Sequence, residues 1–171
     1  PAKNPNPESL ASPRPPRMPM TREDRLSAWH VAHAAAPKEE MAAADVEALQ
    51  ALRAASKELS DRWFAEDHPR DWEGISMKEK RVCSIDLYCC PTLRALPSEI
   101  GQLKMLKTLN LSECSNLAVL PPEIGQLEKL EELILSKCEQ LAALPCEVGQ
   151  LKRLVTLDLD GCTRLATLPT E

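Results

Sequence analysis

Cysteine is the residue type in this chain with the widest chemical repertoire, because a thiolate can bind a metal, form a disulfide or act as a nucleophile. Four of the seven cysteines recur every 24 residues: Cys90, Cys114, Cys138 and Cys162. The other three, Cys83, Cys89 and Cys146, leave an odd total, so a complete disulfide framework is not expected. The four recurring cysteines could form a metal site or disulfides, and the alternative that we favour is that they are inert structural thiols.

Other catalytic or metal-binding patterns are sparse. His30 and His33 are spaced to share a metal on one helix face, but no third histidine or cysteine stands nearby to complete the site. No glycine-rich phosphate loop, nucleophile elbow, HExxH or CxxC motif is present. The adjacent Cys89 and Cys90 should point to opposite faces of the chain. We therefore expect neither enzymatic activity nor a bound cofactor or metal.

Composition and charge exclude further classes of function. The chain has 171 residues, 43% of them hydrophobic and 3% aromatic, with a formal net charge of −5. Residues 82–171 carry 8 basic and 12 acidic side chains, so no basic face for nucleic acid is expected. No apolar run reaches the roughly 20 residues of a membrane helix, and no signal peptide pattern is visible. The cysteine content favours a reducing compartment, and hence the cytoplasm.

The elements that position these residues follow from an internal repeat. The octets LPSEIGQL, LPPEIGQL and LPCEVGQL begin 24 residues apart at Leu96, Leu120 and Leu144, and LPTE begins at Leu168. The aliphatic residues between them also recur in register, in the columns Val82, Leu106, Leu130, Leu154; Ile85, Leu109, Leu133, Leu157; and Leu87, Leu111, Leu135, Leu159. Alternating xLxLx segments predict short strands with one buried face. Stacked copies would pair these strands in parallel. Because the last copy is cut short, we expect the chain to be a fragment of a longer protein.

The full pattern is LxxLxLxxCxxLxxLPxEIGxL, over 82–105, 106–129, 130–153 and, in part, 154–171. This pattern resembles the leucine-rich repeat family, in its plant and algal type. The resemblance implies an α/β solenoid with short parallel strands on the concave face and irregular or short helical return arms. It also implies that the recurring cysteines are buried and hydrogen-bond to backbone in the turns.

The first 81 residues differ from the repeats. Residues 1–20 hold seven prolines and few large apolar side chains, which predicts a disordered tail. A polyproline ligand within this tail is the alternative. Residues 21–81 are expected to be a helical capping region. Its first helix would run over 21–36 from a cap at Thr21, and a second would begin with Asp45 as N-cap and extend to about Trp63.

This region resembles the N-terminal cap of plant-type leucine-rich repeat proteins. The residues that match are Asp45, Ala48, Leu49, Ala51 and Leu52 in the helix; Trp72, Gly74 and Ile75 after it; and Arg81, Val82, Ile85 and Leu87 at the first strand. Secreted members have two cysteines flanking the tryptophan, where this chain has Arg70 and Met77. Trp63 and Trp72 are expected to plug the end of the core, with ligand stacking as the alternative.

The resemblance implies that partners bind on the concave face. Side chains between the strand leucines should point there: Ser84, Asp86, Tyr88, Thr108, Asn110, Ser112, Glu132, Ile134, Ser136, Thr156, Asp158 and Asp160. Glu132, Asp158 and Asp160 favour a basic partner, and Ile134 and Tyr88 are candidate anchors.

We therefore predict a non-catalytic module that binds a protein or peptide. The alternative is a recognition or regulatory segment of a larger signalling enzyme or receptor, such as a receptor-like kinase or a nucleotide-binding immune receptor.

Overall fold

A computed structural model describes residues 41–166. The expected tail over 1–20, the expected helix over 21–36, His30 and His33 lie outside these residues.

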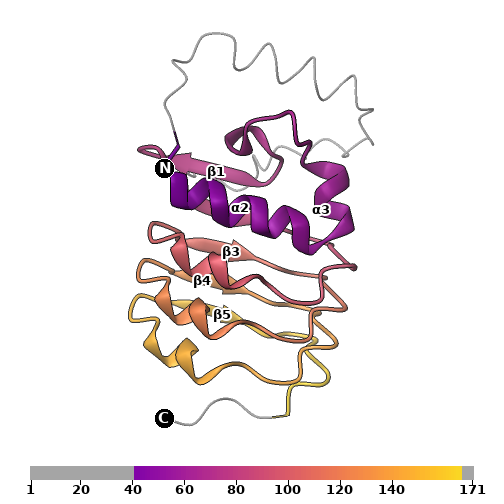
Figure 1. The fold of residues 1–171 in the computed structure, drawn as a ribbon. Coiled ribbons are helices and arrows are strands. Elements are labelled where there is room, and N and C mark those ends of the chain that lie inside the picture. The colour runs from indigo at the N-terminus through magenta and orange to yellow at the C-terminus, as the bar shows by residue number, and fades with distance from the viewer. Residues whose placement is uncertain (1–40, 167–171) are drawn as a thin grey trace, which may run out of the picture. The chain divides into compact units, whose positions relative to one another are not determined.

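The described chain begins with two helices and continues as a stack of coils (Figure 1). The α-helices are α2 (Ala43–Ala55) and α3 (Lys57–Arg62). The short 3-10 helices are η1 (Pro69–Asp71), η2 (Ser98–Gln102), η3 (Pro122–Gln126) and η4 (Cys146–Gln150). The strands are β1 (Ile75–Lys78), β2 (Arg81–Asp86), β3 (Thr108–Asn110), β4 (Glu132–Ile134) and β5 (Thr156–Asp158).

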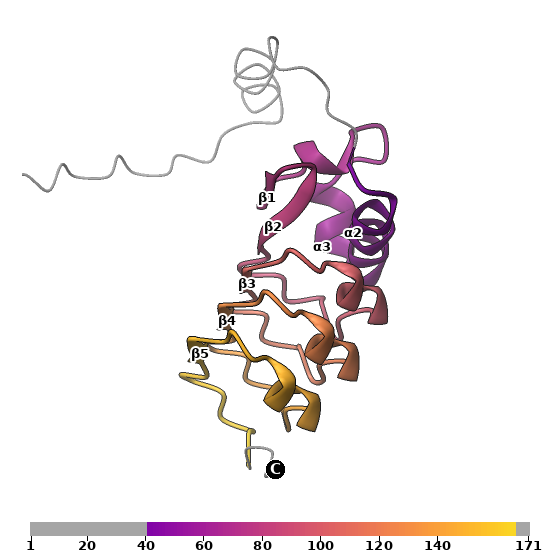
Figure 2. The ribbon, with the colours of Figure 1, turned by 90° about the vertical axis from the view of Figure 1, so that its left-hand side faces the viewer.

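The strands form one sheet in the order β1-β2-β3-β4-β5. β2 to β5 pair in parallel, with Ile85 beside Leu109, Leu109 beside Leu133, and Leu133 beside Leu157. Each coil is thus offset from the next by one sequence period, which confirms the predicted repeat. Figure 2 shows the strands along one side of the stack and the 3-10 helices along the other. We call residues 82–105, 106–129, 130–153 and 154–166 coils 1 to 4.

The core is the set of aliphatic columns merged from coil to coil. Val82, Ile85 and Leu87 of coil 1 have no solvent exposure, and the same columns are fully buried in coils 2 and 3. In coils 2 and 3 these side chains lie between the equivalent side chains of the coils on either side, so their burial depends on neighbouring coils. The predicted α/β solenoid and its leucine core are confirmed.

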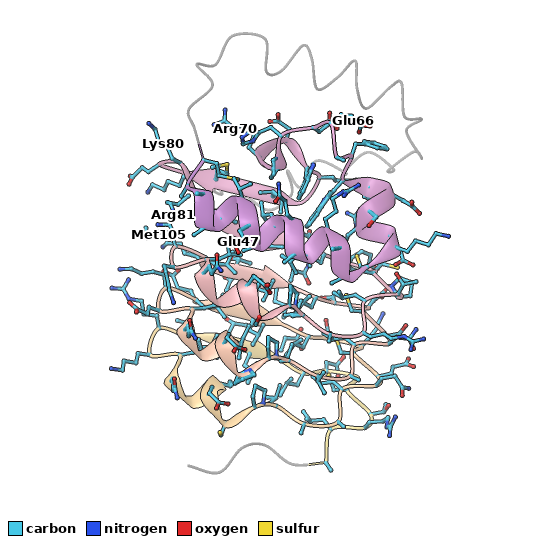
Figure 3. The ribbon with its side chains drawn as sticks, in the orientation of Figure 1. Glu47, Glu66, Arg70, Lys80, Arg81 and Met105 are labelled. Carbon is cyan, nitrogen blue, oxygen red and sulfur yellow. The ribbon has the colours of Figure 1, made fainter. Side chains whose placement is uncertain are left out.

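The capping helix differs from its prediction at both ends. Asp45 is not the N-cap, because the helix already begins at Ala43 and its N-cap, Ala42, makes no side-chain capping bond. Asp45 is instead fully buried and accepts hydrogen bonds from Arg81 and from the backbone N–H of Val82. Arg81 lies beside the start of α2 in Figure 3. The helix is also interrupted at Ser56, where φ is −144° and ψ is 137°, so α3 is a separate helix.

The capping region is not helical throughout. β1 pairs antiparallel with β2 and forms the first edge of the sheet, a strand that the expected helical region over 21–81 did not include. Gly74 leads into β1 with φ at +87°, and a Cβ there would lie 2.2 Å from the carbonyl oxygen of Asp86. The hairpin therefore needs glycine at this position, both for conformation and for space.

The glycines of two return arms are required for space and not for backbone conformation. Neither Gly101 nor Gly125 has a positive φ. A Cβ would lie 2.9 Å from the Glu123 carbonyl oxygen at the first position and 2.5 Å from that of Glu147 at the second. Glycine is required here because the backbone of the following coil passes so closely.

Candidate functional site

The two tryptophans of the capping region are core residues. Trp63 is fully buried and Trp72 is 5% exposed, and their rings stack with centroids 4.8 Å apart. The Trp63 Nε1–H donates to the carbonyl oxygen of Glu73, and the Trp72 Nε1–H donates to that of Phe64. Rings that are buried and hydrogen-bonded in this way are not available to stack on a ligand, so the plug interpretation is confirmed.

The recurring cysteines are structural. Cys114, Cys138 and Cys162 donate their thiol hydrogens to the carbonyl oxygens of the preceding coil, at Sγ–O distances of 3.3, 3.3 and 3.1 Å. The acceptors are Leu87, Leu111 and Leu135. Burial raises the pKa of Cys138 to about 12, which keeps its thiol protonated and inert.

Cys90 has no preceding coil and instead accepts from Arg62 Nη1 at 3.6 Å. The neighbouring Cys114 side chain and the Arg62 guanidinium together lower the pKa of Cys90. All seven cysteines are free. Over residues 41–166, no three His, Cys, Asp or Glu side chains are grouped so as to hold a metal ion. The same residues include no helix long and apolar enough to cross a bilayer.

The surface that remains is the outward face of β2 to β5 and the two residues that follow each strand, which we call the strand face (Figure 2). Its exposed members are Asp86, Tyr88, Glu132, Thr156 and Asp160. Its half-buried members are Ser84, Thr108, Asn110, Ile134, Ser136 and Asp158. The prediction that Ser112 contacts a partner is corrected, because Ser112 is buried and is not accessible to a partner.

The first half of the strand face is a closed polar network. Asn110 Nδ2 donates to Asp86 Oδ1 at 3.0 Å, and Asn110 Oδ1 accepts from both the backbone N–H and the hydroxyl of Ser112. The Ser136 hydroxyl in turn lies 3.1 Å from that of Ser112. These hydrogen bonds explain the burial of Ser112, because the neighbouring polar side chains cover it. Polar groups that already have partners leave little binding capacity for a ligand.

Two of the predicted site residues also support the backbone. Asp86 Oδ1 accepts from the N–H of Tyr88, and Asp158 Oδ1 accepts from the N–H of Asp160, each at 3.0 Å. Sequence reasoning treated these aspartates as free contact residues. Aspartate and asparagine commonly bond the N–H two residues on, so the residue type itself was the missed signal.

A row of hydrogen-bonded side chains, two of them charged, lies along the border of the strand face. The sequence analysis did not predict it. Glu113 accepts from the Tyr88 hydroxyl at 2.7 Å and from Lys137 Nζ at 2.6 Å. The hydrogen bond from Lys137, followed by that from Tyr88, lowers the pKa of Glu113, and the bond to Glu113 raises the pKa of Tyr88. Glu113 and Lys137 lie just before the recurring cysteines, with φ near +60°. This left-handed turn directs their side chains to the border of the strand face, which strand alternation alone does not predict.

The second half of the strand face is open. Ile134 lies beside Asn110 on one side and Asp158 on the other, and it ends the polar network because it has no polar side-chain atom. Glu132 is exposed and accepts a long hydrogen bond of 3.4 Å from Thr108 Oγ1. A half-buried aliphatic side chain between two carboxylates can bind a group that is partly apolar and partly basic.

Comparison with known proteins agrees with this geometry. Residues 105–127 match a family model described as Leucine Rich Repeat. A plant ice-binding protein superposes with a TM-score of 0.61 at 28% identity, over 71% of this chain and 41% of that one. A leucine-rich repeat protein from Bacteroides eggerthii superposes with a TM-score of 0.53 at 13% identity, over 79% of this chain and 39% of that one, and shows the fold alone.

A third structure, the leucine-rich repeat domain of the type III effector XopL, is 40% identical over 47% of this chain and 27% of its own, with a TM-score of 0.44. The search of curated proteins finds no match. The chain spans about 41% of the length of the plant structure. The repeat pattern, the family model matched over residues 105–127 and the solenoid architecture together show that the chain contains leucine-rich repeats.

Proposed function

We propose that this chain is a non-catalytic interaction module that binds a protein or peptide on the strand face, over β4 and β5. The observation that carries the proposal is the position of Ile134, an aliphatic side chain at the end of a polar network and beside Glu132 and Asp158. An apolar anchor within a polar rim is the arrangement that gives many protein interfaces their affinity and specificity.

The distribution of sequence variation also supports the strand face. The return arms repeat Glu, Gly and Gln at fixed positions in the segments SEIGQ, PEIGQ and CEVGQ. The central column of the strand face instead changes from Asp86 to Asn110 to Ile134 to Asp158. A recognition surface needs different side chains on a constant support, and the strand face has this property.

The charge of the open half indicates the class of partner. Glu132 and Asp160 are exposed carboxylates, and Asp158 is half-buried. Opposite charges at an interface rim mainly increase association rate and specificity. We therefore propose a partner segment with a basic side chain near Glu132 and an apolar side chain on Ile134.

We further propose a cytoplasmic location, supported by the seven free thiols and by Arg70 and Met77 in place of a cysteine pair. The second candidate function is a recognition or regulatory segment of a larger signalling enzyme or receptor. The two functions are distinguished by the gene, because a kinase or ATPase motif in the same polypeptide would favour the second.

The likeness to a plant ice-binding protein raises a third class of ligand. An ice surface repeats identically, so a complementary protein face should present the same group on every coil. The strand face does not, because its central column mixes aspartate, asparagine and isoleucine. Thermal hysteresis of the purified chain would show ice binding directly, and we expect none.

The experiment that tests the proposal is selection of peptides from a random library, followed by binding assays on two variants. Ile134→Asp removes the anchor but introduces a residue that the same column already holds in coils 1 and 4. Val119→Asp is the matched control, because Val119 is 55% exposed and lies outside the strand face. We expect selected peptides to contain Lys or Arg beside an apolar residue and to lose binding only to Ile134→Asp. Equal loss on both variants, or on neither, would contradict the proposal.

A further inference from the structure

Basic side chains are concentrated on one edge of the stack. This edge consists of the turn of the β1–β2 hairpin and the three loops that lead from a 3-10 helix into β3, β4 and β5, at 78–81, 104–107, 128–131 and 152–155. These sixteen residues carry eight basic and three acidic side chains, whereas the rest of 41–166 carries seven basic and seventeen acidic side chains. We call the four segments the basic edge, because they have a positive net charge in a chain that is otherwise acidic.

The four segments lie side by side although they are far apart in the sequence. The Lys107 N–H donates to the carbonyl oxygen of Cys83, in β2, at 2.8 Å. The Glu131 N–H donates to the carbonyl oxygen of Lys107, and the Val155 N–H donates to that of Glu131, both at 2.8 Å. Neighbouring strands lie about 4.8 Å apart, so the basic edge extends for about 14 Å along the stack.

Most cations of the basic edge have no partner within the described chain. Five of them form no hydrogen bond or ion pair through their side chains with another residue of 41–166: Lys78, Lys80, Lys152 and Arg153, which are exposed, and Lys129, which is half-buried. The other three are held by neighbouring acceptors: Arg81, Lys104 and Lys107. The edge therefore has unpaired positive charge that a partner can neutralise.

The basic edge also includes an apolar contact. Met105 stands one sequence period after Arg81, and Figure 3 shows both on the same side of the stack as Lys80. Met105 is 36% exposed. A methionine side chain is flexible and adapts its shape to the group that it contacts.

Carboxylates border the basic edge on both sides. Glu99 and Glu123 are half-buried on the return arms, in η2 and η3, and Glu132 is exposed on the strand face. A DNA duplex or a bilayer is wider than a single loop, and its phosphates would approach these carboxylates. A single extended chain that runs along the stack can contact the cations and avoid the carboxylates on either side.

We propose that the basic edge binds an acidic segment of a partner protein in an extended conformation. A strand rises about 3.3 Å per residue, so about five residues cover the length of the edge, and every second side chain faces it. Complementary charge on the two surfaces increases the association rate and the specificity. This surface is separate from the proposed binding site on the strand face, which attracts the opposite charge.

The test measures binding of a fluorescein-labelled hexaglutamate peptide to the whole chain by fluorescence anisotropy. The peptide should bind at low salt and be released at high salt, because exposed charges are screened. A serine–glycine peptide of the same length should not bind. Lys129→Gln with Lys152→Gln removes two unpaired cations and should raise the Kd of hexaglutamate about threefold to tenfold, since each exposed ion pair is individually weak.

Lys57→Gln with Arg94→Gln is the matched control. It changes the net charge equally at two exposed residues, in α3 and in the loop after β2, that are not part of the basic edge. We expect the control to leave the Kd almost unchanged and both double variants to keep the Tm of the parent. Equal weakening by the two double variants, or no binding of hexaglutamate at low salt, would overturn the proposal.

Three further probes distinguish other sites and other classes of partner. Ile134→Asp should bind hexaglutamate as the parent does, and a loss of binding there would place the peptide on the strand face. A short DNA duplex and vesicles of phosphatidylserine and phosphatidylcholine should bind more weakly than hexaglutamate. If either binds more tightly and is released by Lys129→Gln with Lys152→Gln, the basic edge is a phosphate-binding surface and the proposal is overturned.

Discussion

The hydrogen bonds of Asp45 with Arg81 and Val82, which join the capping region to the first repeat strand, give the most specific prediction about stability. Asp45 is fully buried, and its carboxylate accepts from Arg81 Nε and Nη2 at 2.9 to 3.1 Å and from the Val82 N–H at 2.8 Å. Asp45→Ala removes all of these bonds and leaves the Arg81 guanidinium and the Val82 N–H without their acceptor. We expect the variant to be strongly destabilised.

The magnitude follows from what remains after the substitution. Removing one partner of a buried ion pair costs about 3 to 5 kcal/mol. The Arg81 side chain is 30% exposed and can recover part of its hydration after the substitution. We therefore use the lower end of that range for the loss of the ion pair. The buried Val82 N–H loses its acceptor outright, which alone costs about 1 to 3 kcal/mol. We therefore expect Asp45→Ala to lower the free energy of unfolding by about 3 kcal/mol.

Urea unfolding followed by tryptophan fluorescence measures this loss, because Trp63 and Trp72 are buried in the same region. Asp45→Asn is the matched control, since it keeps an oxygen acceptor for the Val82 N–H but removes the charge. Its loss should be smaller than that of Asp45→Ala. A loss below about 1 kcal/mol for Asp45→Ala is well under the range for a buried ion pair. Such a result would contradict the claim that Asp45 stabilises the packing of α2 against β2.

Three further predictions concern single side chains. Trp72→Ala should lower the free energy of unfolding by about 3 to 5 kcal/mol in urea, as other buried tryptophan truncations do. NMR titration should give Glu113 a pKa below the ordinary value of a glutamate, and Lys137→Ala should bring this pKa back toward that value, because the hydrogen bond from Lys137 is the largest cause of the shift. The small, solvent-screened contribution of Glu113 to stability should be lost as the pH falls through the lowered pKa. Thiol labelling should modify the exposed Cys146 in the folded chain but reach the buried Cys138 only after unfolding.

Much of the architecture could be predicted from the sequence because one period controls it. The spacing of Leu109, Leu133 and Leu157 alone predicts parallel pairing in register, and the structure has that pairing. The inert role of Cys114 and Cys138 followed from the same repetition. Because every copy of the repeat has the same environment, each further copy supports the same prediction of strand pairing and cysteine role.

The features that prediction missed depend on contacts unique to one place. The buried position of Asp45 depends on Arg81, which is distant in sequence, whereas an N-cap assignment uses local pattern only. Ser112 is buried because Asn110 and Ser136 cover it, although alternation correctly placed it on the outward side. Gly101 is required because the backbone of the next coil passes close to it, and a local sequence pattern does not show this contact.

The central claim, that partners bind the open half of the strand face, is tested most directly by binding kinetics with two charge-matched double variants. Glu132→Gln with Asp158→Asn removes two carboxylates from the strand face while keeping an acceptor for the Asp160 N–H. Glu99→Gln with Glu123→Gln changes the net charge equally on the return arms.

For a peptide obtained by the random-library selection, we predict that only the first double variant slows association at low salt. Equal slowing by both would mean that general charge attraction, and not the strand face, accounts for binding.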